Sequence, residues 1–259
     1  MLPAFVPAVV LACFVHPTVL DHEVGTRALP WLPPDLARQV ARHMPEFHAG
    51  AAAAAAWPGS FHRIGGSQDL TIAIRTQCER LSVAIRSRAP FGEVVAGFGV
   101  LAHLAVDLNS PFSTASAGDA YAQSFASYVP SAAPRIPLVF YGQEPATIRG
   151  SAINLPRTMV SRRTEVDLLE AIVREDLDRI GGPNAWRGLD DRSSTFGTAS
   201  LLLNHAATDF VNLAAWVWYH AGGLVPDLPV GEDMILVWKG EPQPREALGP
   251  RLAFRQARP

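Results

Sequence analysis

The chain has 259 residues, of which 48% are hydrophobic, and its 22 Lys and Arg residues against 24 Asp and Glu residues give a net charge of −2. This size allows one large domain or two small ones with a sizeable core, and the near-neutral charge gives no strong nucleic-acid signature. Cys13 and Cys78 are the only two cysteines. The chain therefore lacks the closely spaced cysteines that hold a metal ion through thiolates, and any metal ion is expected to be held by nitrogen and oxygen ligands.

The chain begins with an apolar segment at residues 2–15, which is too short to span a membrane. It is compatible with a signal sequence, with a lipid anchor at the weak box ending in Cys13, or with an element packed on the domain. We therefore separate residues 1–20 from the rest, and a secreted, periplasmic or lipid-anchored location stays open. No later apolar run is long enough to cross a bilayer without polar interruption, so no transmembrane span is expected.

Most of the remaining chain shows the 3.6-residue periodicity of helices, and alternating strand patterns are nearly absent. Pro34 favours a helix start, Pro45 is expected to break or kink that first helix, and the glycine pair before Pro183 predicts a helix end. The sequence predicts an all-α, single-domain multi-helix bundle over residues 21–223, with helices at 34–57, 68–88, 90–109, 118–129, 163–180 and 192–220.

Three segments have unusual composition. The six alanines at 51–56 favour close helix–helix packing over disorder. Residues 130–160 contain five prolines and predict a long loop, with one short strand in the apolar run 136–141. Residues 224–259 predict a Pro-rich, irregular C-terminal tail in which 233–238 is the only strand-like piece.

The most informative residues lie in the apolar helix predicted over 90–109, where His103 and Asp107 are four residues apart. Positions i and i+4 share one helix face, and a carboxylate buried on that face is costly without a partner. A divalent metal ion is one partner that both side chains could share. A hydrogen bond between the two side chains is the other, and the spacing alone leaves both open.

The same spacing recurs at His205 and Asp209 in the helix predicted over 192–220. Two such pairs on core helices are compatible with a metal site built from facing helices. A buried polar network with Asn204 and Asn212 is the alternative.

The residues from Gly99 to Ser113 read Gly-x-x-x-His-x-x-x-Asp-x-x-x-Pro, with Pro111 at the end. This motif resembles the centre of the zinc-dependent phospholipase C and single-strand nuclease superfamily, and the resemblance extends over roughly residues 20–222. It implies a helical bundle of that type. It also implies clustered zinc ions that activate water and neutralise phosphate, with a phospholipid or other phosphoester as substrate.

Several family ligand positions carry other residues here. Where the family has a His two residues after the proline, this chain has Ser113, and where the family has a His–Glu pair, it has Asp119 and Gln123. Upstream, the family's Gly-Thr-His segment corresponds to Gly25-Thr26-Arg27, and the family Asp is missing from Trp57-Pro58-Gly59. A hydroxyl and a neutral amide are weak zinc ligands, so one zinc ion or none is expected.

His62 follows the turn at 57–59, where the family has further ligands. The candidate metal ligands are therefore His103, Asp107, Asp119 and His62, and Asp107 is also the candidate catalytic residue. Two functions follow as hypotheses. One is a zinc-dependent phosphoester hydrolase with a degenerate site and weak activity. The other is a non-catalytic relative that binds a lipid or protein partner. The sequence does not indicate an oligomeric state.

Overall fold

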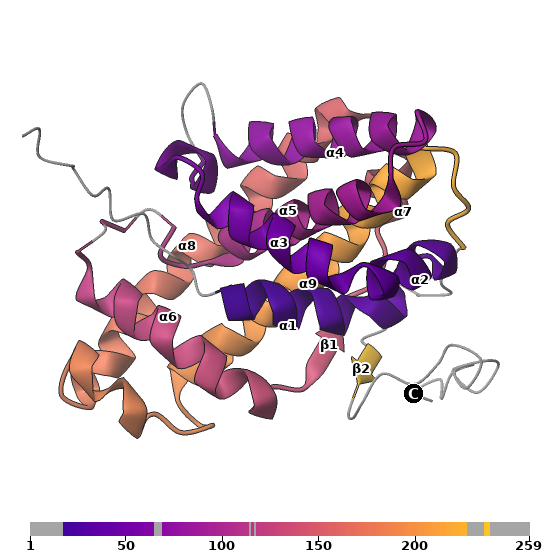
Figure 1. The fold of residues 1–259 in the computed structure, drawn as a ribbon. Helices are drawn as coiled ribbons and strands as arrows, with labels where there is room; N and C mark the ends of the chain where they lie inside the picture. The colour runs from indigo at the N-terminus through magenta and orange to yellow at the C-terminus, as the bar shows by residue number, and fades with distance from the viewer. Residues whose placement is uncertain (1–17, 65–68, 114, 117, 227–235, 239–259) are drawn as a thin grey trace, which may run out of the picture.

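The computed structural model describes residues 18–64, 69–113, 115–116, 118–226 and 236–238. Within these ranges the chain is an all-α, multi-helix domain, as predicted, with short 3-10 turns between the helices (Figure 1). The α-helices are α1 Thr18–Ala28, α2 Pro34–Arg42, α3 Met44–Ala55, α4 Leu70–Arg86, α5 Phe91–Asn109, α6 Ala120–Ala132, α7 Pro145–Arg149, α8 Leu155–Arg179 and α9 Ser194–His220.

Helix α5 lies at the centre of the bundle, in contact with α3, α4 and α9, and α1 packs on both α5 and α9 (Figure 1). All residues from 98 to 109 are buried. Among the described helices, α5 alone is long and apolar enough to cross a membrane, but 78% of its most apolar window is buried inside the protein. Its hydrophobicity on all sides is that of a central core helix.

Helices α3 and α5 pack backbone against backbone. A Cβ atom added at Gly50 would lie 1.8 Å from the carbonyl oxygen of Ala96, and one added at Gly99 would lie 1.9 Å from that of Phe47. No side chain fits at either position, since such distances are far below contact. The close helix packing predicted from the alanine run is confirmed, and it fixes the position of α5 in the bundle.

Proline explains where several helices begin. The helix predicted over 34–57 is divided into α2 and α3, and Pro45 occupies the first turn of α3. Similarly, Pro156 lies in the first turn of α8, which begins at Leu155, eight residues before the predicted start at 163. Proline is favoured in a first turn because its missing N–H would have no partner there.

The predicted loop at 130–160 is therefore shorter than expected. It contains the strand β1 Leu138–Phe140 and the short helix α7 before α8 begins. Strand β1 pairs antiparallel with β2 Leu236–Trp238, with Val139 opposite Val237. Both short strands fall where strand-like runs were predicted.

The two ends of the chain are described only in part. The apolar segment 2–15 lies outside the described residues, and so does most of the tail 224–259. Residues 18–20, which we had placed with the N-terminal segment, form the start of α1, where Leu20 is buried in the core.

Candidate metal centre

Helix α5 brings His103 and Asp107 together as their spacing predicts. Both side chains are 1% exposed, and Nε2 of His103 lies 3.4 Å from Oδ2 of Asp107. The predicted shared, buried face is confirmed. His103 Nε2 makes no hydrogen bond within the described part of the chain, so this nitrogen and the Asp107 carboxylate face each other without a short contact.

His62 joins this pair from a separate segment. It ends the 3-10 turn Gly59–His62, and its Nδ1 lies 2.6 Å from Oδ2 of Asp107. Its ring stands edge-on to that of His103, with 5.3 Å between ring centroids. One ligand atom from each of the three residues lies within 4.8 Å of the other two. Two imidazoles and one carboxylate form a ligand set that zinc commonly takes.

Each imidazole is oriented by a partner at its other nitrogen. Nδ1 of His103 is 3.0 Å from Oδ2 of Asp21, and Nε2 of His62 is 3.2 Å from the carbonyl oxygen of Trp57. When Nδ1–H of His103 and Nε2–H of His62 donate to these oxygens, the opposite nitrogens carry the lone pairs. Those are the nitrogens that face Asp107, which is the arrangement of metal-bound histidines and their supporting carboxylates or carbonyls.

Asp21, from α1, is fully buried, and the sequence analysis did not single it out. It lies 82 residues before His103, and no spacing in the sequence connects an acidic residue of α1 with a motif of α5. The available signal is weak: Asp21 lies between the apolar residues Leu20 and Val24, in a helix that also carries other charged side chains.

The negative charge around His103 is also partly compensated without a metal ion. Burial acts to lower the pKa of His103, but the charge of Asp107 and the hydrogen bond and charge of Asp21 outweigh it and raise the pKa to about 9. An imidazolium between two carboxylates then compensates one of the two buried negative charges. A divalent cation and this proton therefore compete for the same carboxylates.

The structure does not bring Asp119 into this cluster. Its side chain caps the N-terminus of α6, where it accepts hydrogen bonds from the backbone N–H groups of Tyr121 and Ala122 at 2.9 and 3.1 Å, and it forms an ion pair with Arg174 of α8. Burial favours a higher pKa for Asp119, but Arg174 and the backbone N–H groups outweigh it and lower the pKa. The carboxylate is thus committed to a cap and an ion pair.

Arg27, in the segment that replaces the family Gly-Thr-His, has structural contacts, as do two further histidines of α1 and α3. Arg27 forms an ion pair with Glu23 and donates to the carbonyl oxygen of Ile136 at 2.9 Å, which ties α1 to the segment before β1. His22 lies 2.8 Å from His48 of α3, between Nδ1 and Nε2, and neither belongs to the cluster of three.

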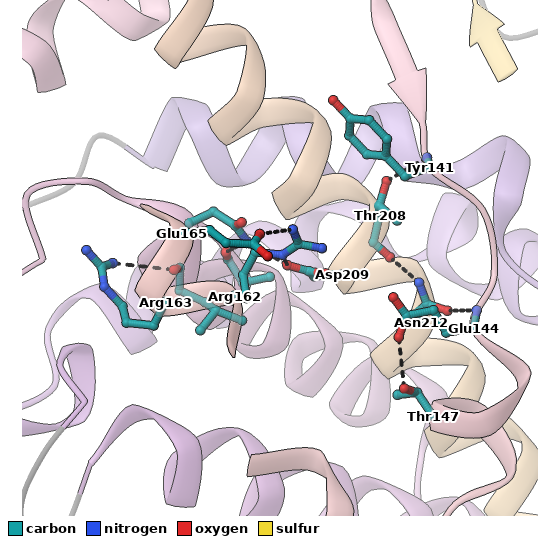
Figure 2. A network of polar contacts seen from close by, with 12 residues as sticks. Tyr141, Glu144, Thr147, Arg162, Arg163, Glu165, Thr208, Asp209 and Asn212 are labelled. Atoms are coloured by element: carbon teal, nitrogen blue, oxygen red, sulfur yellow. Dashed lines mark hydrogen bonds and ion pairs between the residues drawn. The ribbon is translucent and has the colours of Figure 1, made fainter. Parts of the chain in front are cut away.

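Among the described residues, the second His–Asp pair does not join a third metal-ligating side chain. Asp209 contacts Asn109 and Arg162 instead of Asn204 and Asn212, the partners proposed for a polar network. Polar side chains of α9 bind the backbone of the segment after β1: Oδ1 of Asn212 accepts from the N–H of Glu144 at 2.8 Å, and Oγ1 of Thr208 accepts from that of Tyr141 at 3.2 Å (Figure 2). His205 stacks on the Tyr141 ring at 4.3 Å, and burial lowers the pKa of His205 to about 4. His205 is thus a neutral stacking partner.

Comparison with models of protein families and with curated protein sequences gave no match. The resemblance to the phospholipase C and nuclease superfamily therefore rests on the residues of α5 and their surroundings alone.

Proposed function

We propose that the protein binds a single zinc ion through His62 Nδ1, His103 Nε2 and the Asp107 carboxylate, and that it is a weak zinc-dependent phosphoester hydrolase. The observation that carries the metal site is the orientation of both imidazoles. Asp21 and Trp57 hold the outer nitrogens at 3.0 and 3.2 Å, so that the inner nitrogens converge on one carboxylate. The hydrolase assignment comes from the resemblance around His103 and Asp107.

A zinc ion with three protein ligands keeps a fourth position open, where it activates water and polarises a phosphoryl oxygen. The chain's own residues have simpler tasks. Asp107 supplies the negative charge that attracts the cation, and its Oδ2 lies 2.6 Å from Nδ1 of His62 and 3.4 Å from Nε2 of His103. Asp21 and the Trp57 carbonyl keep the rings in place. His62 is the most accessible of the three, with 16% of its side chain exposed, so we place the substrate side of the site at His62.

The expected activity is weak because a second ion has few ligands. Asp119 is held by Arg174 and by the α6 backbone, and Ser113 and Gln123 offer a hydroxyl and an amide. Two-metal hydrolysis relies on a second ion to stabilise the attacking or leaving oxygen. With one ion, that part of the stabilisation is missing.

Metal analysis tests the site. The full chain is stripped with a chelator, dialysed against zinc and analysed by mass spectrometry of the metal content. We expect about one zinc ion per chain, and we expect His62→Gln and Asp107→Asn to lose it while keeping the helical circular dichroism spectrum. Asp35→Asn, an exposed change on α2, is the matched control and should retain zinc. Unaltered protein without stoichiometric zinc would show that the cluster is a buried salt-bridge network only.

Turnover tests the chemistry separately. Bis(4-nitrophenyl) phosphate and 4-nitrophenyl phosphorylcholine report phosphodiester cleavage by colour. We expect slow, zinc-dependent hydrolysis that the Asp107→Asn variant loses together with its metal. Zinc-loaded protein with no turnover on either compound would contradict the hydrolase proposal and favour the non-catalytic relative that binds a lipid or protein partner.

A further inference from the structure

A cavity of about 200 Å³ lies where α8 and α9 meet α7 and the end of α5. One wall is apolar and consists of four buried side chains, Leu108, Leu155, Met159 and Leu213. A dry cavity of about 150 Å³ is enough to hold benzene, so this space has room for a small organic molecule. None of the three residues of the metal cluster lines it.

The other wall of the cavity is polar and carries more negative than positive charge. Arg162 is the one cation among its described lining residues, against the carboxylates of Glu144, Glu165 and Asp209. Nη1 of Arg162 lies 3.0 Å from Oε2 of Glu165, and its Nε lies 3.5 Å from Oδ2 of Asp209 (Figure 2). A single guanidinium is therefore shared between two carboxylates.

Two hydrogen bonds to these carboxylates come from neutral groups. Asp209, 18% exposed, accepts a hydrogen bond from Nδ2 of Asn109 at 2.8 Å, and Glu144 accepts one from Oγ1 of Thr147 at 3.0 Å. Burying a carboxylate is costly unless a cation compensates its charge. Accordingly, burial raises the pKa of Asp209 to about 6, with the charges of Glu144 and Glu165 adding to the rise and Arg162 and Asn109 opposing it.

We propose that this cavity is a binding site for a small organic ammonium ion, with its charged nitrogen between Asp209 and Glu144 and its apolar body against Leu108, Met159 and Leu213. An ammonium group has three hydrogen-bond donors and no acceptor, which suits a wall with an excess of carboxylates. The apolar side chains select against bare alkali ions, and the excess of two negative charges among the described lining residues selects against a carboxylate ligand. This site is independent of the proposed zinc centre.

Three isosteric compounds test the proposal by isothermal titration calorimetry on the full chain near neutral pH. Isopentylamine carries the charge and the apolar body, isopentyl alcohol lacks the charge, and isovalerate reverses it. We expect saturable binding of one amine per chain, about tenfold or more weaker binding of the alcohol, since a charge-assisted hydrogen bond is lost, and no binding of isovalerate. Chelation of metal should leave the amine affinity unchanged.

Two variants locate the site. Asp209→Asn keeps the shape of the side chain and should weaken amine binding about tenfold or more, and Glu165→Gln, which releases Arg162 toward Asp209, should weaken it to a smaller extent. Glu175→Gln, an exposed change on the same helix α8, is the control and should bind as the unaltered chain does. The proposal is overturned if the amine shows no saturable binding at millimolar concentration, if the alcohol binds equally well, if isovalerate is preferred, or if Asp209→Asn binds unchanged.

Discussion

Replacing Asp21 with Asn separates the two roles that the buried cluster can have. The substitution keeps the size of a side chain that is fully buried, and the amide oxygen can still accept from Nδ1 of His103, which lies 3.0 Å from Oδ2 of Asp21. Only the charge disappears. In metal-free protein, the imidazolium of His103 then keeps one carboxylate, Asp107, at 3.4 Å from Nε2.

Two measurements have separate expected values. Loss of a charged hydrogen bond in a buried site should lower the free energy of unfolding of the metal-free protein by about 1–3 kcal/mol, measured by urea denaturation. The Asp21 carboxylate accepts a hydrogen bond from the nitrogen of His103 that does not bind the metal. Its loss should weaken zinc binding about 10–100-fold, or about 1.4–2.7 kcal/mol, as measured by competition with a chromophoric chelator. Asp35→Asn, whose exposed carboxylate pairs with Arg38 within α2, should change neither quantity appreciably.

The combination of results decides between the roles. A loss of stability with unchanged zinc affinity would refute the orienting role of Asp21 and leave it as an ion-pair partner only. A loss of zinc affinity in a variant of unchanged metal-free stability would show instead that the charge balance around His103 contributes little to folding.

Two further predictions concern packing and pH. Gly99→Ala should destabilise the protein by about 3 kcal/mol, because the new Cβ would lie 1.9 Å from the Phe47 carbonyl oxygen. Gly197→Ala in α9 is the control: a Cβ there has nothing within 4 Å, so the change should be neutral or slightly stabilising. Equal effects of the two changes on urea unfolding would contradict the backbone contact. Burial raises the pKa of Asp209 in the folded protein from 3.8 to about 6, so its carboxylate destabilises the fold once it ionises. The Asp209→Asn variant should therefore gain about 1–3 kcal/mol of stability relative to the unaltered chain as pH rises from about 4 to above 6. A difference between the two proteins that does not vary with pH in urea titrations would refute this.

The parts of the fold that were predictable from sequence are those fixed within one helix. Helix α5 has a proline immediately before it and an unbroken apolar run, so its limits and the shared face of His103 and Asp107 follow from the 3.6-residue period. Close helix packing of the alanine run was predicted from its small residues for the same local reason, whereas its partner, α5, was not predicted. Residues 130–160 were predicted less well because proline both interrupts helices and starts them, and the choice depends on what the segment packs against.

The candidate site was only half predictable, because its other half depends on contacts between distant segments. His62 reaches Asp107 across 45 residues, and its ring orientation depends on the path of the turn that exposes the Trp57 carbonyl. Asp119 shows the converse. Its position in the motif favours a ligand, but Arg174, 55 residues later, and the free N–H groups of α6 provide nearer partners. Position in a motif cannot reveal the competition with Arg174, because that residue comes from the packing of α8 on α6.

The placement of Asp21 connects these arguments. A buried carboxylate beside a buried histidine is costly unless a positive charge compensates it. Asp21 and Asp107 stabilise either a protonated His103 or a metal ion bound to Nε2 of His103. Helix packing alone would be served equally well by apolar side chains at these positions, as buried ion pairs can often be replaced without loss of stability. The arrangement adds an accessible imidazole, His62, whose Nδ1 lies 2.6 Å from the Asp107 carboxylate. Ligand atoms of His62, His103 and Asp107 lie within 4.8 Å of one another, which is the convergence that a zinc site requires. For that reason the metal proposal is preferred over a purely structural cluster.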